Sequence, residues 1–310
     1  MSKSVVSLRN RLPIPEIGGK AHSLCVLLNN GFNVPQGVVV RSSAFFDFLE
    51  YNDLAKGIHK LALEITQDNF KEKSAYVREE ILKGRIPGDI ISEIEKFLNK
   101  LGAKYVAIRS SGAIEDSLKS SFAGLFDTFL NIRVESSLVL ENMIKCWASL
   151  FNERVVIYRI RKSMPQLEGM AVIIQEMVPA DISGITFSVH PLNEKTLLIE
   201  ASYGLGDLIV GGKIDPDTIV VDRKTHKILE IKIGCKSKMS VCDDSGLKVI
   251  DVPQELAHKL ALHSNKVKEI VDISLKVEEI FNTPQDIEWC ISNERIWLLQ
   301  SRAITALVKE

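Results

Sequence analysis

The last apolar stretch of the chain, residues 286–305, contains acidic, amide and guanidinium side chains. Two apolar segments flank four polar residues, 292–295, and this pattern is typical of a β-hairpin. Because side chains alternate between faces along a strand, Gln300 and Arg302 share one face. A loop with an odd number of residues puts Glu288 on that face too, whereas a two-residue loop puts it on the other.

We expect a three-residue loop, 293–295, because it pairs Glu288 with Gln300 and Asp286 with Arg302. A carboxylate and an amide oxygen on one face suit Mg²⁺, a hard cation that takes oxygen ligands and leaves positions for phosphates. Arg302 beside them is suited to bidentate phosphate binding. On these residues alone, an ordinary amphipathic hairpin with a solvated polar face explains the pattern equally well.

Composition excludes several classes of protein. A chain of 310 residues with a formal net charge of −1 is not a binder of nucleic acid or of membrane surfaces through bulk charge. Its five cysteines have no C-x-x-C spacing, so neither a zinc site nor a disulfide framework is indicated. No signal peptide is visible, and no apolar run approaches the roughly 20 residues of a membrane helix. We expect a cytoplasmic protein with reduced thiols.

The chain changes character near residue 166, where helical periodicity gives way to short β-rich segments. We therefore predict an α/β (α+β) protein with an N-terminal α/β lobe, 1–166, and a C-terminal sheet-rich lobe, 167–310. Within these lobes the pattern predicts one long helix over 135–161 and another over 253–280.

Two segments of the N-terminal lobe carry groups suited to anions. Segment 17–20, Ile-Gly-Gly-Lys, opens a predicted helix, where backbone N–H groups and the lysine can approach an anion. It is not a P-loop, and a plain helix start is an alternative. The strand 104–109 ends in Arg109, Ser110 and Ser111, which suggests a phosphate cradle of one guanidinium and two hydroxyls. Serine-rich turns are also common in ordinary loops.

Together these segments resemble the nucleotide-binding domain of phosphoenolpyruvate synthase, pyruvate phosphate dikinase and rifampin phosphotransferase. The resemblance covers nearly the whole chain and rests on a series of short motifs in the same order. These motifs are Gly18-Gly19-Lys20-Ala21, Arg109-Ser110-Ser111, Glu115-Asp116, Ser121-Phe122-Ala123-Gly124, Phe126-Asp127-Thr128, Ser149-Leu150-Phe151 with Arg154, Gln175-Glu176-Met177-Val178, Ser183-Gly184, Gly204-Leu205-Gly206, and Asp286-Ile287-Glu288 with Leu299-Gln300-Ser301-Arg302.

The resemblance implies an ATP-grasp-like fold of two lobes with ATP between them. It implies that Lys20 and Arg109 bind phosphates and that Gly124 and Thr128 form part of a phosphate-facing loop. A lysine, two arginines and Mg²⁺ would neutralise the charge that develops in phosphoryl transfer, so Lys20, Arg109 and Arg302 are the candidate catalytic residues.

The resemblance also implies an adenine-binding segment and a metal site. Segment 175–178, with Gln175, Glu176, Met177 and Val178, would face the adenine, Glu176 and Val178 mainly through backbone groups. The metal ligands would be Glu288 and Gln300, with Arg302 on the transferring phosphate. The implied cofactors are ATP and Mg²⁺.

The chain departs from the family in three places. Gly112-Ala113 stands where Ala followed by Thr or Asn is usual, and His190 stands where an acid is more common. None of the six histidines lies in the Thr-Gly-Gly context of the family's phosphohistidine carrier.

We therefore expect AMP-forming transfer from ATP to a histidine of a separately encoded carrier. The alternatives are a self-contained small-molecule kinase that forms ADP, an ATP-sensing module without turnover, and ATP-dependent ligation through an acyl phosphate.

Overall fold

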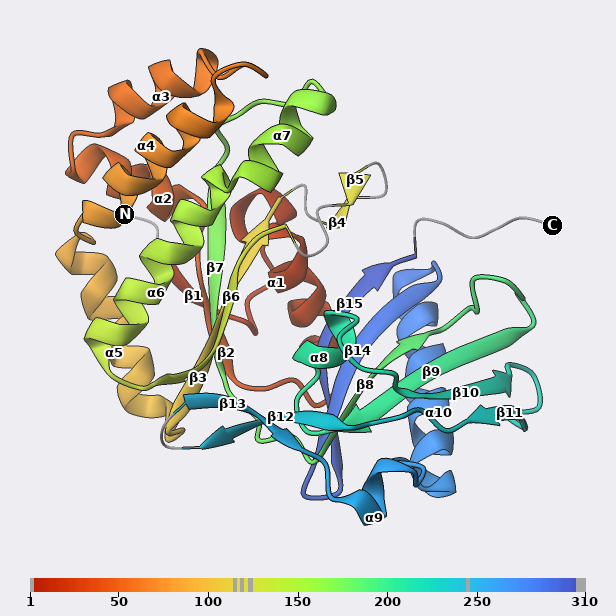
Figure 1. The fold of residues 1–310 in the computed structure, drawn as a ribbon. Coiled ribbons are helices and arrows are strands. Elements are labelled where there is room, and N and C mark those ends of the chain that lie inside the picture. The colour runs from red at the N-terminus through yellow and green to blue at the C-terminus, as the bar shows by residue number, and fades with distance from the viewer. Residues whose placement is uncertain (1–2, 114–115, 118–119, 122–124, 244–245, 305–310) are drawn as a thin grey trace. The chain divides into compact units, whose positions relative to one another are not determined.

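The computed structural model describes residues 3–113, 116–117, 120–121, 125–243 and 246–304. The chain forms two compact units (Figure 1). Unit 1 comprises Met1–Cys25 and Gln36–Met177, and unit 2 comprises Val26–Pro35 and Val178–Glu310.

Unit 1 is built on a five-stranded antiparallel sheet. In spatial order its strands are β1 (Val5–Ser7), β2 (Gly37–Val40), β7 (Met170–Glu176), β3 (Tyr105–Gly112) and β6 (Thr128–Arg133). The central strand is β7, which is paired with β2 on one side and β3 on the other. The last boundary between the units follows Met177, since β7 belongs to the first sheet. The division into lobes at residue 166 stays a prediction.

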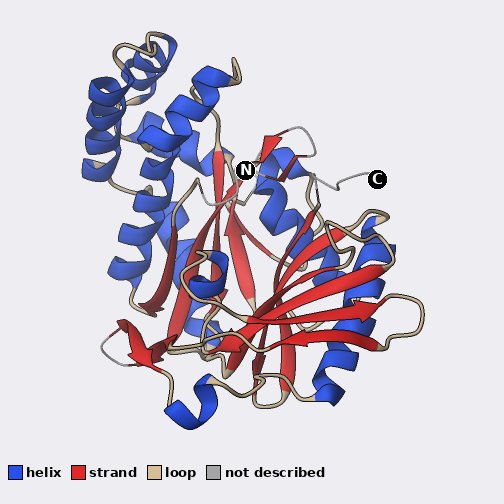
Figure 2. Ribbon diagram, turned by 45° about the vertical axis from the view of Figure 1, so that its right-hand side comes forward, coloured by secondary structure: helices blue, strands red, loops and turns tan. Residues whose placement is uncertain are grey.

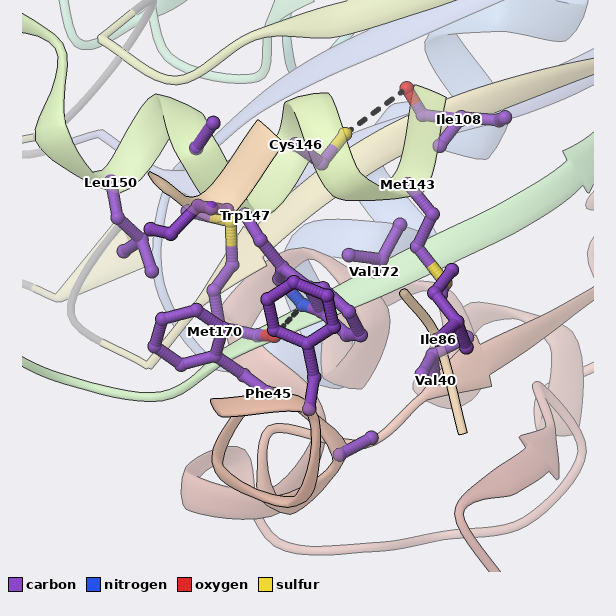
Figure 3. Close-up of a cluster of buried hydrophobic side chains, with 14 of the residues drawn as sticks. Val40, Phe45, Ile86, Ile108, Met143, Cys146, Trp147, Leu150, Met170 and Val172 are labelled. Carbon is purple, nitrogen blue, oxygen red and sulfur yellow. Dashed lines mark hydrogen bonds between the residues drawn. The ribbon is translucent and has the colours of Figure 1, made fainter. Parts of the chain in front are cut away.

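Helices cover one face of this sheet (Figure 2). They are α2 (Ser43–Tyr51), α3 (Ala55–Leu63), α4 (Phe70–Lys83), α5 (Gly88–Leu101), α6 (Ser136–Ala148) and α7 (Glu153–Arg161). Alternate strand residues such as Val106, Ile108 and Val172 point into the resulting core. The indole of Trp147 is fully buried there against Phe45 and donates to the Met170 carbonyl at 3.0 Å (Figure 3). Burial of so large a ring contributes about 3–5 kcal/mol relative to alanine.

The prediction of one helix over 135–161 is wrong. α6 ends in a 3-10 turn, Ser149–Phe151, and α7 begins after Asn152, whose backbone is extended at φ −60° and ψ 140°. Two contacts explain the break: the Ser149 hydroxyl donates to the Cys146 carbonyl at 2.6 Å, and the Asn152 amide donates to the Asp127 carboxylate at 3.2 Å. Side-chain bonds of this kind compete with the helical ladder.

Unit 2 contains a six-stranded antiparallel sheet. In spatial order its strands are β11 (Ile228–Lys232), β10 (Asp217–Asp222), β9 (Thr196–Tyr203), β8 (Ile182–Phe187), β14 (Gln285–Ser292) and β15 (Arg295–Ala303). Helix α10 (Ser264–Phe281) packs against β14 and β8. Its apolar stripe faces the sheet's buried apolar positions, among them Ile199 and Ile287.

The predicted helix over 253–280 is also interrupted, because α9 (Gln254–Ala257) and α10 are separate. The backbone between them turns to satisfy a buried carboxylate: the Ala261 N–H donates to Asp217 Oδ2 at 2.7 Å. Asp217 also accepts from Lys236 Nζ at 2.5 Å and from the Gly234 N–H at 3.0 Å, and neither charged side chain is exposed. A buried carboxylate needs several donors of this kind to offset the loss of water.

The remaining elements of unit 2 lie at the end of the sheet near the Gly204–Gly206 loop. Helix α8 (Asp207–Val210) contacts β8, β9 and β12 (Lys238–Asp243), and β12 pairs with β13 (Gly246–Asp251). In unit 1, the short strands β4 (Asp116–Ser117) and β5 (Ser120–Ser121) pair with each other. Among the described residues, no helix is both long and apolar enough to cross a membrane.

Candidate functional site

The predicted phosphate ligands of unit 1 lie on the face of its sheet opposite the helical core. Arg109 is paired with Thr128 of β6 and with Ile173 of β7, so these three side chains share a face. Gln175 follows on the same face, and its Oε1 accepts a hydrogen bond from the Arg109 guanidinium at 3.4 Å. Arg109 and Gln175 are buried, whereas Thr128 is exposed. The sheet thus brings together three of the residues that the sequence singled out.

Helix α1 (Ile14–Asn29) brings Lys20 to the same strand. Its backbone leaves the helical conformation at Gly18, with φ 74° and ψ 167°, and then continues as a helix. Lys20 is buried, and its Nζ donates to the Ser110 carbonyl at 3.3 Å. The ammonium group of Lys20 therefore lies at Ser110, the residue next to Arg109 in β3. This arrangement is suited to an anionic ligand.

The two serines of the predicted phosphate cradle have other positions. Ser110 alternates with Arg109 and lies on the core side of β3 opposite Val172, where its hydroxyl is buried without a partner among the described residues. The Ser111 hydroxyl faces α1, donates to the Ile17 carbonyl at 2.8 Å and accepts from the Ala21 N–H at 3.0 Å. Neither hydroxyl is placed for the predicted phosphate cradle. Strand alternation turns Ser110 to the face opposite Arg109, and the Ser111 hydroxyl is hydrogen-bonded to α1.

The predicted adenine segment is the end of β7. The Glu176 N–H donates to the Gln36 carbonyl at 2.7 Å, and the Met177 N–H donates to the Tyr105 carbonyl at 3.0 Å. These bonds fix the backbone of Glu176 and Met177, and Val178 is the next residue, the first of this part of unit 2. Gly124 lies outside the described residues. The adenine role of this segment stays a prediction.

In unit 2 the hairpin has the pairing that the sequence predicted, Glu288 with Gln300 and Asp286 with Arg302. The predicted three-residue loop is wrong. Ser292 pairs with Arg295, which leaves a two-residue turn, 293–294, with both φ angles positive. A bulge restores the register: Trp289 pairs with Leu298 and Glu288 with Gln300, so Leu299 is the extra residue.

Arg302 is held by its cross-strand neighbour. Both its Nε and one terminal nitrogen donate to Asp286 Oδ2, at 2.8 and 2.6 Å. Asp286 is 7% exposed, and its second oxygen is buried without a hydrogen-bond partner among the described residues. Asp286 thus orients the guanidinium and keeps one acceptor available for a further donor or cation. The sequence placed Asp286 opposite Arg302 and assigned it no role.

A further acid on this face was missed from the sequence. The register runs from Glu288 of β14 through Ile185 of β8 to Glu200 of β9, so Glu200 shares the face of Glu288. Burial raises the pKa of the Glu200 carboxyl, and the nearby Asp286 and Asp215 raise it further. The signal in the sequence was its alternation with the apolar residues Ile199 and Ala201, just before the Gly204–Gly206 loop.

The donor set of this face fits Mg²⁺ in kind. Glu288 and Gln300 are cross-strand neighbours that offer one carboxylate and one amide oxygen. Within the described residues, no group of three or more His, Cys, Asp or Glu side chains could hold a metal ion. Glu288 and Gln300 are the residues that would hold Mg²⁺, a cation that commonly keeps positions for phosphate oxygens and water.

Residues 14–310 match the family described as "Pyruvate phosphate dikinase, AMP/ATP-binding domain". A protein of Archaeoglobus fulgidus named "Probable phosphoenolpyruvate synthase" is 38% identical over 307 residues, which cover 96% of this chain and 41% of that protein. A "Probable phosphoenolpyruvate synthase" of Methanothermobacter thermautotrophicus is 36% identical, covering 94% of this chain and 44% of that protein. The chain therefore spans less than half of the length of these relatives.

A second kind of relative carries a different name. The "Rifampicin phosphotransferase" of Bacillus subtilis is 32% identical over 320 residues, which cover 99% of this chain and 36% of that protein. Among solved structures, D-alanyl-alanine synthetase A of Vibrio cholerae matches 72% of this chain and 50% of that chain, with a TM-score of 0.28 and 10% sequence identity. That likeness is too weak to bear on the fold.

Proposed function

Because the chain belongs to the pyruvate phosphate dikinase AMP/ATP-binding domain family, we propose that it binds Mg-ATP and transfers a phosphoryl group. The observation that carries this proposal is the hairpin face, where the oxygen pair Glu288 and Gln300 lies beside an Arg302 that Asp286 orients. Phosphoryl transfer depends on positioning and on charge neutralisation more than on covalent help from the protein.

Each unit supplies part of this chemistry in the proposal. In unit 1, Lys20 and Arg109 bind phosphate oxygens with Gly124 and Thr128, and the end of β7, Gln175 to Val178, takes the adenine. In unit 2, Glu288 and Gln300 hold Mg²⁺. Support for the unit 1 roles comes from the shared face of Arg109, Thr128 and Gln175 and from the anchoring of Lys20 on β3.

We further propose dikinase-type transfer, in which ATP and water are converted to AMP and phosphate: the β-phosphoryl group ends on a histidine, and the γ-phosphoryl group goes to water and is released as phosphate. The acceptor in this proposal is a histidine outside residues 1–310, with a separate carrier protein as the candidate; none of the six histidines within residues 1–310 has the context expected of a carrier. This step rests on the family resemblance.

The reaction is tested by incubating the purified chain with Mg-ATP, alone and with cell extract, and following nucleotides and phosphates by ³¹P NMR. AMP and phosphate formed with extract support dikinase transfer to a carrier. ADP formed with a small acceptor identifies a direct kinase, and turnover that requires a carboxylate and an amine identifies a ligase. Binding without turnover identifies a sensing module, and absence of ATP binding contradicts the proposal as a whole.

The role of Arg302 is tested by Arg302→Ala, which we expect to lower the rate of phosphoryl transfer by roughly 10³-fold or more if this arginine stabilises the transition state. Arg295→Ala is the matched control, because Arg295 is exposed at the other end of β15. Single-turnover rates with both variants give the comparison. Equal rates for Arg302→Ala and Arg295→Ala would exclude a role for Arg302 in the transfer step.

A further inference from the structure

We propose that the Ser111 hydroxyl is a positioning group that holds α1 in its kinked form and so keeps Lys20 beside Arg109. The inference rests on the proposed function, because it concerns a residue that the proposal assigns to the phosphates. Ser111 itself is fully buried on β3. In this proposal it affects phosphate binding only through the position of α1.

The hydroxyl replaces one bond of the helical ladder. In a regular α-helix the N–H of residue 21 would donate to the carbonyl of residue 17. Here the Ala21 N–H donates instead to Ser111 Oγ at 3.0 Å, and Ser111 Oγ donates to the Ile17 carbonyl at 2.8 Å. A side chain inserted into the i→i−4 ladder is one of the known causes of a helix kink.

The kink also requires glycine at position 18. A Cβ on Gly18 would lie 2.0 Å from the Ser111 carbonyl oxygen and 2.3 Å from its hydroxyl oxygen, and the backbone has a φ of 74°. The close approach of α1 to β3 and the insertion of the hydroxyl are therefore one structural feature. Either change, a side chain at 18 or loss of the hydroxyl at 111, acts on the same contact.

The position of Lys20 follows from this contact. Lys20 lies between Gly18 and Ala21, and its Nζ donates to the carbonyl of Ser110, the residue before Ser111. Arg109 is the next residue back along β3, and its guanidinium contacts Gln175. Three consecutive residues, 109–111, thus set the spacing of the two cations.

Loss of the hydroxyl leaves the Ala21 N–H and the Ile17 carbonyl without partners in a buried place. The backbone can then regain a bond by closing the ordinary i→i−4 contact across Gly18. That movement would shift Lys20 relative to Arg109. We therefore expect the affinity for the phosphates of ATP to fall and the affinity for the nucleoside to stay the same.

The test compares Ser111→Ala with Ser110→Ala in the full chain. Ser110 is equally buried, its hydroxyl has no partner among the described residues, and its backbone carbonyl, which Lys20 contacts, remains in alanine. We expect Ser111→Ala to weaken Mg-ATP binding about tenfold or more, with adenosine affinity unchanged, and Ser110→Ala to bind both like the wild type. Affinities are measured by isothermal titration calorimetry, and thermal unfolding checks that each variant is folded.

A double variant separates positioning from general damage. If Ser111 acts through Lys20, Lys20→Ala with Ser111→Ala binds ATP no more weakly than Lys20→Ala alone. Should Ser111→Ala be recovered unfolded, Ser111→Cys keeps the shape of the side chain with a weaker donor and acceptor. The same loss of ATP affinity, with adenosine affinity unchanged, is expected of it.

The inference is overturned if Ser111→Ala, or Ser111→Cys in its place, binds ATP as tightly as Ser110→Ala, or loses ATP and adenosine equally. It is also overturned if the losses from Lys20→Ala and Ser111→Ala add in full. A wild-type chain that does not bind ATP would instead contradict the proposed function.

Discussion

Gly18 shows how much of this molecule depends on single atoms. Its φ of 74° is a conformation that L side chains rarely adopt, and a Cβ there would overlap the backbone of Ser111. Arg302 depends similarly on Asp286, whose one oxygen takes two of its N–H groups. At both positions the partner lies on another strand or helix. The conformation of Gly18 and the orientation of Arg302 therefore depend on residues distant in the sequence.

Replacing Gly18 by alanine should destabilise the folded chain by about 3 kcal/mol or more, because backbone strain of about 1–3 kcal/mol adds to the overlap with Ser111. Gly31→Ala is the matched control, since Gly31 has a φ of 85° but no atom within 4 Å of the added Cβ. The Gly31→Ala variant should lose only the free energy that corresponds to the backbone strain. Urea unfolding of both variants gives the free energies, and equal losses would mean that the overlap is relieved at little cost.

The thiols of the chain should differ sharply in reactivity. Burial raises the pKa of Cys290 to about 12 and that of Cys25 to about 11, so both remain protonated at pH 8. The pKa of Cys242 is raised to about 11, mainly by burial and further by Asp207 and Asp243. Cys235 is exposed. Because the thiolate is the reactive form, we expect a thiol reagent at pH 8 to modify Cys235 first in the native chain, and Cys25, Cys242 and Cys290 only slowly.

The same pKa shifts predict the direction in which the stability of the folded chain changes with pH. A thiol whose pKa is raised by folding favours the folded state as long as it is protonated, and this contribution is lost as pH rises from about 9 through 11 to 12. The free energy of unfolding should therefore fall over that range. Fast modification of Cys25 or Cys290 in the native chain at pH 8 would contradict the buried environment described for them.

The β14–β15 hairpin combines a short turn with a bulge. Residues 293 and 294 have φ angles of 49° and 61°, which match the right-handed twist of the flanking strands. The bulge at Leu299 then shifts the register so that Glu288 and Gln300 become neighbours. The hairpin thus contains two separate features, the two-residue turn and the bulge. Together they determine which side chains are cross-strand neighbours.

The turn can be improved without touching the candidate site. Glu294→Gly should raise the free energy of unfolding by about 0.5–1 kcal/mol, because glycine adopts a positive φ without a steric penalty. Its carbonyl, which accepts from Lys266, is kept. Asn293→Gly is the control and should gain less, since asparagine tolerates this conformation. Thermal unfolding measures both; a loss of stability in Glu294→Gly would show that its side-chain charge outweighs the backbone strain.

On the scale of the whole chain, the two compact units are interleaved in sequence. Unit 2 includes Val26–Pro35, far from the rest of it along the chain. From this segment the Asn33 carbonyl accepts the Leu298 N–H at 2.9 Å, and the Asn33 amide donates to the Ile296 carbonyl at 3.1 Å. These bonds engage the backbone of β15 at the edge of the six-stranded sheet, which would otherwise be open to pairing with another chain.

We expect Asn33→Ala to lower the free energy of unfolding by about 1 kcal/mol, since it removes the side-chain hydrogen bond to Ile296. Asn30→Ala is the matched control, because the Asn30 amide donates a local, exposed bond to the Val26 carbonyl. Urea unfolding compares the two. If both lose equally little, the segment is held by its backbone contact with Leu298 alone.

The sequence by itself determined the hairpin, the strand that ends in Arg109 and the family, because alternation and the order of short motifs are local properties of the chain. It placed Glu288 opposite Gln300 correctly, although for a loop length that proved wrong. It predicted single helices where Asn152 and Asp217 interrupt them, since those breaks depend on partners distant in sequence.

Only the tertiary structure decided which polar groups serve a ligand and which serve the fold. Ser110 and Ser111 are adjacent and chemically identical, yet one hydroxyl faces the core and the other completes the ladder of α1. The Leu299 bulge and the contact of Asp286 with Arg302 likewise depend on cross-strand partners. The physical reason is that a hydrogen bond is set by the atoms that packing brings within about 3 Å, and residue type alone does not specify them.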